Sequence, residues 1–113
     1  MWTRGARETV ARFINAPQLE SIVFTKGGTQ AINIVANGVN IQPGDEIVLS
    51  VMEHHSNIVP WHFLRERKGA VLRWLDIDDD GGVDLAALDA LIGPRTKMVA
   101  ISHMSNVLGA RTP

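Results

Sequence analysis

The stretch that decides the fold of this chain is residues 43–68, which read PGDEIVLSVMEHHSNIVPWHFLRERK. Its Pro-Gly-Asp opening is a turn signal, and the segment Glu-Ile-Val-Leu-Ser that follows, from Glu46 to Ser50, is typical of a strand. Residues 57–68 are predicted to form a helix, because Pro60 falls in the first turn, where proline is tolerated. A turn, a strand and a helix in this order are typical of an α/β fold.

The same alternation continues on both sides of this stretch. Further strands are predicted at residues 21–25, 70–77 and 97–102. Three more helices are indicated by apolar spacing from Ala6 to Ile14 and from Ala31 to Gly38, and by Asp84 as an N-cap. The alternation predicts one α/β domain over residues 1–113, with a mostly parallel four-stranded sheet and flanking helices. Such a sheet would keep an exposed edge, so we expect the chain to be a piece of something larger.

The composition is that of an ordinary globular protein. Of 113 residues, 45% are hydrophobic and 20% are charged, and the formal net charge is −1. This charge argues against nucleic acid or an anionic membrane as a partner, and the N-terminus shows no apolar signal core. The chain contains no cysteine, which excludes disulfides, thiolate metal sites and a cysteine nucleophile within it. We expect a cytoplasmic protein.

A glycine-rich turn precedes the predicted helix at Ala31. Residues 25–30 read TKGGTQ, between a predicted strand and that helix. A helix N-terminus offers unpaired N–H groups and a positive dipole end, so this turn is a candidate phosphate site, with the Thr29 hydroxyl as a further donor. The pattern matches neither a Walker loop nor the GxGxxG fingerprint. A plain strand-to-helix connector is the other interpretation.

Two histidines, His54 and His55, follow the strand that ends at Ser50. The ligand crevice of an open α/β sheet lies beyond the carboxyl ends of its strands, which is where these residues fall. Adjacent histidines on a loop are poor joint ligands for one metal, and no HExxH-like spacing occurs, so we predict no metal site. A histidine ring stacked on an aromatic cofactor and a buried structural histidine are the two remaining interpretations.

Two other polar segments follow strands. Residues 76–81, DIDDDG, begin like a calcium loop, but the twelfth position is Ala87 and a strand precedes the segment, which favours a solvated acidic turn. Residues 102–109, SHMSNVLG, follow the last predicted strand. The amide of Asn106 could donate to a phenolate oxygen of a bound ring, or it could cap a turn.

Taken together, these segments resemble one family. They read FINA at residues 13–16, IVFT at 22–25, AIN at 31–33, PGDEI at 43–47, EHHSNIVPW at 53–61 and HMSNVLG at 103–109. This order closely resembles class V aminotransferase-fold enzymes, specifically the Suf-type cysteine desulfurases and the similar selenocysteine lyases. The resemblance covers essentially all 113 residues, and segment 53–61 is its most specific part.

The resemblance implies part of the large domain, which binds pyridoxal 5′-phosphate (PLP), of an aspartate-aminotransferase-like (fold type I) enzyme. By this resemblance, Gly28 and Thr29 match the loop that holds the phosphate, and His54 matches the histidine that stacks on the pyridine ring. Asn106 matches the asparagine that hydrogen-bonds the 3′ oxygen of the cofactor. The family usually has two threonines where this chain has Gly28 and Thr29, so one hydroxyl donor to the phosphate is absent.

The implied parent reaction takes sulfur from L-cysteine, giving L-alanine and an enzyme persulfide for iron–sulfur cluster assembly. A sulfur-acceptor protein and a homodimer partner are expected for the full-length parent. The family's Schiff-base lysine and nucleophilic cysteine have no match here, so we predict no catalytic residue in the chain and no turnover by it alone. The alternatives are a non-catalytic binding or assembly fragment, a truncated gene product, and a fragment of a lyase acting on L-selenocysteine or of another class V enzyme.

Overall fold

The chain consists of two compact units, residues 1–31 and residues 32–113. The computed structural model describes residues 2–105, 107–109 and 111–113. No helix in this described part is both long enough and apolar enough to cross a membrane.

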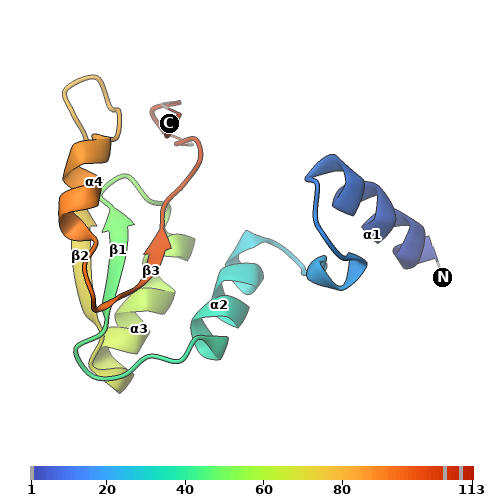
Figure 1. The fold of residues 1–113 in the computed structure, drawn as a ribbon, viewed down its shortest axis with the longest axis horizontal. Helices are drawn as coiled ribbons and strands as arrows, with labels where there is room; N and C mark the ends of the chain where they lie inside the picture. Colours follow the sequence, from blue (N-terminus) through green and yellow to red (C-terminus); the bar gives the residue numbers. More distant parts are fainter. Residues whose placement is uncertain (1, 106, 110) are drawn as a thin grey trace. The chain divides into compact units, whose positions relative to one another are not determined.

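A three-stranded parallel sheet forms the centre of residues 32–113 (Figure 1). Its strands are β1 (Glu46–Ser50), β2 (Val71–Leu75) and β3 (Thr96–Ala100), arranged in the order β2-β1-β3. The predicted α/β class with a parallel sheet is confirmed. The predicted count of four strands is wrong for the described residues, and the strands predicted at 70–77 and 97–102 are shorter than expected.

Helices cover both faces of this sheet because the side chains of β1 alternate. Ile47 and Leu49 pack against Trp61 in a cluster that also contains residues of α2 (Gly28–Gly38) and α3 (Val59–Lys68). Val48 points to the other face, where Leu75 and partly buried residues of α4 (Leu85–Leu91) pack against it. The central strand is therefore buried on both faces, as expected for the three consecutive apolar residues at its middle.

The helix ends follow the local sequence. Pro60 lies in the first turn of α3, as predicted, and Gly69 ends the helix in a left-handed conformation with a φ of 72°. The helix begins at Val59 rather than at Asn57, because residues 55–57 form the separate 3-10 turn η2 (His55–Asn57). The predicted N-cap of α4 is confirmed, since the Asp84 carboxylate accepts a 2.9 Å hydrogen bond from the N–H of Ala86.

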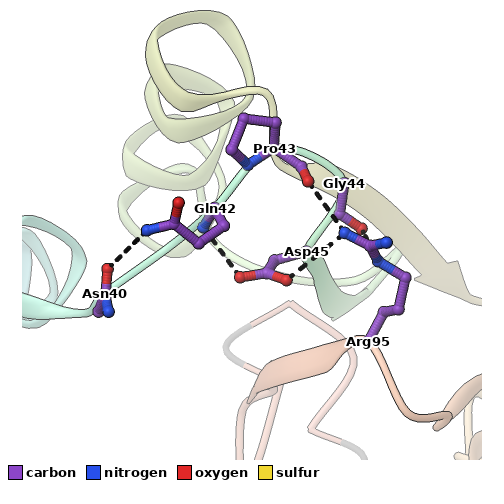
Figure 2. Close-up of polar contacts among 6 residues, drawn as sticks. All are labelled: Asn40, Gln42, Pro43, Gly44, Asp45 and Arg95. Carbon is purple, nitrogen blue, oxygen red and sulfur yellow. Dashed lines mark hydrogen bonds and ion pairs between the residues drawn. The ribbon is translucent and has the colours of Figure 1, made fainter.

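The turn before β1 is tied to the residue before β3, as Figure 2 shows. Arg95 donates to the carbonyls of Pro43 and Gly44 at 2.9 and 3.0 Å, and its guanidinium lies 3.8 Å from the Asp45 carboxylate. Asp45 also accepts a 2.8 Å bond from the N–H of Gln42. Gly44 has a φ of 85°, and a Cβ there would lie 2.6 Å from the Arg95 guanidinium. These bonds hold the amino ends of β1 and β3 side by side. Because the two strands are parallel, their carboxyl ends lie at the same edge of the sheet.

Residues 1–31 contain α1 (Trp2–Phe13), the 3-10 turn η1 (Leu19–Ser21) and the first turn of α2. Arg7 of α1 donates to the carbonyls of Leu19 and Ile22 at 3.1 and 3.0 Å. The predicted first helix is confirmed, but its expected buried face is not, since Phe13 is 89% exposed. The strand predicted at residues 21–25 is wrong: Ile22 is extended, but this segment has no ladder partner among the described residues.

Candidate functional site

The carboxyl end of the sheet carries a buried acid, Glu53, three residues after β1. Its carboxylate accepts hydrogen bonds from the Ser50 hydroxyl, from Nδ2 of Asn57 at 2.9 Å and from the Ser102 hydroxyl at 2.7 Å. Ser50 ends β1, Asn57 ends η2, and Ser102 lies just beyond β3. One carboxylate therefore connects the segments that follow two neighbouring strands.

Opposing effects act on the pKa of Glu53. Burial raises this pKa, because a low-polarity environment disfavours the charged form. The hydrogen bonds donated by Ser50, Ser102 and Asn57 lower it and prevail, so the pKa of Glu53 lies below its ordinary value. The group is therefore an anion at neutral pH, held by neutral donors.

Asn57 links the same acid to the sheet and to α3. Its Nδ2 donates to the carbonyl of Ala100 at 3.0 Å as well as to Glu53, and its Oδ1 accepts a 2.9 Å bond from Nε1 of Trp61. All of these polar atoms have partners, and no buried side-chain nitrogen or oxygen among the described residues lacks one. The loop between β1 and α3 is thus fixed at both of its ends.

His54 lies on this loop, next to the buried acid, and its side chain is exposed. Its Nδ1 accepts a 3.1 Å hydrogen bond from the backbone N–H of Ser56 and lies 2.9 Å from the Ser56 hydroxyl. A backbone N–H can only donate, so Nδ1 carries no proton in this arrangement and the neutral ring has its proton on Nε2. The ring of His54 is therefore oriented by its own loop while remaining accessible.

The neighbouring His55 does not share this environment. The centroids of the two imidazole rings lie 6.1 Å apart, with their planes tilted by 58°. Within the described part of the chain, no group of three or more His, Cys, Asp or Glu residues is arranged to hold a metal ion. The acidic turn at residues 78–82 is instead closed by its own backbone, with Asp78 accepting from the N–H groups of Asp80 and Gly82.

The predicted phosphate loop lies in the other unit. Gly28 is the first residue of α2, a Cβ added to it would meet no atom within 4 Å, and the first turn holds no acidic residue. Gln30 reaches back to accept a 2.7 Å bond from the N–H of Lys26, and the Thr25 hydroxyl donates to the Gly27 carbonyl at 2.8 Å. The predicted helix after the glycines is confirmed, and the roles of Gly28 and Thr29 stay predictions.

Asn106, the remaining predicted contact, lies outside the described residues. Of the described residues near it, the buried Ser105 hydroxyl accepts from the N–H groups of Val107 and Leu108 at 3.2 and 3.1 Å. Thr112 returns to the start of segment 102–109, donating from its hydroxyl to the Ser102 carbonyl at 2.5 Å and from its N–H to the His103 carbonyl at 2.7 Å.

Sequence reasoning gave no individual role to Ser50, Glu53, Asn57 or Ser102. A signal was present, because polar residues follow β1 and β3, and the carboxyl ends of neighbouring parallel strands lie side by side. What the sequence did not reveal is that β1 and β3 are neighbours, since β2 lies between them in chain order.

The family model of the class-V aminotransferases matches residues 2–113. The chain belongs to this family. A probable cysteine desulfurase of Mycolicibacterium paratuberculosis is 51% identical over 111 residues, which is 96% of this chain and 16% of that protein. The crystal structure of the Escherichia coli cysteine desulfurase CsdA matches with a TM-score of 0.89 and 43% identity, over 95% of this chain and 28% of that one.

A further similar solved structure is a variant of C-DES, which has glycine covalently linked to its PLP cofactor. It matches with a TM-score of 0.78 and 26% identity, over 92% of this chain and 27% of that one. The fold predicted from the sequence, an α/β piece of a fold type I enzyme, is thereby confirmed. The chain spans between 16% and 28% of the length of these three relatives.

Proposed function

We propose that this chain is the part of a cysteine desulfurase that holds PLP against the carboxyl end of the sheet. The observation that carries the proposal is the 51% identity to a probable cysteine desulfurase over 96% of the chain. Its geometry supports the proposal, because the most specific shared segment, residues 53–61, contains the oriented and accessible ring of His54.

Each of the two groups, taken by itself, has chemistry that suits PLP. When bound, PLP withdraws electrons from the α-carbon of an amino acid substrate. The first turn of α2, with Gly28 in open space and no acidic residue, can bind the phosphate through backbone N–H groups. The face of the His54 ring can stack on the pyridine ring and hold it flat, and Ser56 keeps that imidazole from turning.

The proposed reaction converts L-cysteine to L-alanine and leaves the sulfur as a persulfide. The chain has no cysteine, so the persulfide forms on a residue outside these 113 positions, and the chain alone gives no turnover. We further propose that the full-length protein is a cytoplasmic homodimer that passes its sulfur to an acceptor protein for iron–sulfur cluster assembly.

A hybrid enzyme tests the proposal. In it, residues 1–113 of this chain replace the matching segment of the Escherichia coli cysteine desulfurase, which supplies the remaining sequence. The hybrid enzyme is expected to bind PLP and to release alanine and sulfide from L-cysteine with a thiol present. A soluble, folded hybrid enzyme that binds PLP but produces no alanine from L-cysteine would show that the desulfurase assignment is wrong.

A further inference from the structure

Glu53 is a buried anion that has no cationic partner in the described part of the chain. Its exposed fraction is 7%, and none of the ion pairs formed within the described residues includes it. A buried carboxylate normally costs free energy unless it is paired or fully hydrogen-bonded. Glu53 takes the second route, with donors from three different segments.

The acid at the other end of β1 provides a contrast. Glu46 lies at the amino end of β1 and pairs with Arg73 of β2 at 2.9 Å, an ordinary ion pair between neighbouring strands. Glu53, beyond the carboxyl end, reaches across to Ser102 past β3. A residue that only packed at this position would not need a charge. A carboxylate does more, because its charge strengthens the hydrogen bonds from the surrounding donors and so fixes their positions.

The donors of Glu53 belong to the loop that the proposed function places at the PLP ring and to the segment at residues 102–109, which by resemblance to the family also contacts the cofactor. Asn57 lies on the loop that carries His54. Ser102 begins the segment after β3, and its carbonyl accepts the Thr112 hydroxyl, which closes that segment on itself. A movement of the Glu53 side chain would therefore change the positions of both Asn57 and Ser102.

We propose that Glu53 is a positioning residue for the cofactor, one that locks the His54 loop to the segment beginning at Ser102 so that both meet the PLP ring in a single arrangement. This inference rests on the proposed function. Glu53 acts through Asn57 and Ser102 and does not itself need to touch PLP. Well-supported sites have such a second layer, because side chains in contact with a ligand hold their geometry only when their neighbours are fixed.

The test compares Glu53→Gln with Glu46→Gln in the hybrid enzyme. Glutamine keeps the size of the side chain but replaces one acceptor oxygen with a donor, which opposes the donors around Glu53. We expect Glu53→Gln to weaken PLP binding by about 10-fold, the size of loss that removal of an outer-layer partner causes at metal sites. Glu46→Gln is expected to lose stability without losing PLP affinity.

Amide hydrogen exchange on the PLP-free hybrid enzyme gives a second measurement. In Glu53→Gln, exchange is expected to speed up at residues 55–58 and at the N–H of Thr112, but not around Glu46. If Glu53→Gln does not fold, Ser102→Ala decides the matter, because it removes the hydroxyl bond from Ser102 to Glu53 and leaves the Glu53 carboxylate in place. The same direction of change, but smaller, is expected from Ser102→Ala.

The outcomes separate the two proposals. If the unaltered hybrid enzyme binds no PLP, the proposed function is wrong, and so is the cofactor role of Glu53. If it binds PLP and the folded variant of Glu53 or Ser102 keeps the same affinity as Glu46→Gln, the positioning role alone is wrong. Weaker PLP binding together with faster exchange in both segments would support it.

Discussion

The indole N–H of Trp61 donates to Oδ1 of Asn57 at 2.9 Å, across one turn of chain between η2 and α3. This bond decides which way the Asn57 amide faces, because Oδ1 accepts from the indole and Nδ2 must then point to Glu53 and to the Ala100 carbonyl. A buried tryptophan of the core thus orients a polar residue of the site.

We predict that Trp61→Phe destabilises the hybrid enzyme by about 1–3 kcal/mol, because the partly buried Oδ1 of Asn57 loses its hydrogen-bond donor. PLP affinity should fall as well, since a rotated amide no longer holds Glu53. Urea denaturation and PLP titration measure the two effects. The matched control is Trp74→Phe on β2, where the side chain is 39% exposed. Equal losses from both substitutions would contradict the assigned role of Trp61.

The stacking role of His54 predicts that His54→Ala weakens PLP retention while the fold survives. Stacking on an aromatic face contributes about 0.5–1.5 kcal/mol, so the loss in affinity is modest. The loss in desulfurase rate is larger, up to roughly 100-fold, because a tilted ring misaligns the bond to be broken. His55→Ala is the control, since its ring plane differs by 58° from that of His54. If both variants behave alike after normalisation to folded protein, His54 does not contact the cofactor.

Replacing Gly28 in the predicted phosphate loop is expected to raise the affinity for PLP. Gly28→Thr restores the hydroxyl that the family usually has there, and the open space around Gly28 admits the side chain. We expect PLP affinity to rise about fivefold, the effect of one net hydrogen bond of ~1 kcal/mol. Gly27→Thr serves as the control, because its site is also open but precedes the helix. An equal gain from the two threonines would argue against a specific phosphate contact at position 28.

The lowered pKa of Glu53 predicts a pH dependence. The folded state binds this proton more weakly than the unfolded state, whose value is near 4.5, so the contribution to stability is complete above that pH. This contribution is lost as the pH falls below 4.5 and through the pKa that Glu53 has in the folded state. We therefore expect the free energy of unfolding of the hybrid enzyme to exceed that of Glu53→Gln at neutral pH, and the difference to shrink below pH 4.5. Urea denaturation across this range tests it, and a difference that grows on acidification would have the wrong sign.

The chain by itself is predicted to aggregate or to melt without cooperativity. Within the described residues, the outer edges of β2 and β3 have no strand partner, and Phe13, Val71 and Val107 are among the exposed apolar side chains. Whole domains are stable by only about 5–15 kcal/mol, and a partial sheet has less apolar burial to offset its chain entropy. Circular dichroism and light scattering on heating measure this. A sharp, reversible transition of a monomer would contradict the prediction.

Local chemistry determined the elements that the sequence predicted well. Residues 47–49 are Ile, Val and Leu in succession, so the middle of the strand is buried on both faces. The capping role of Asp84, the left-handed turn at Gly44 and the position of Pro60 each depend on a residue's own backbone preference and on its near neighbours. For the same reason the motif around His54 was recognisable from sequence alone.

Tertiary structure decided the rest, because it depends on partners that are distant in the chain. Residues 21–25 have strand-like chemistry but no ladder partner among the described residues, and a strand exists only when its N–H and carbonyl groups are paired. The order β2-β1-β3 places Ser102 beside the end of β1, 49 positions from Glu53. No spacing in the sequence predicts that the Ser102 hydroxyl reaches Glu53. This hydrogen bond is one of those that lower the pKa of Glu53 and keep its buried carboxylate charged next to His54.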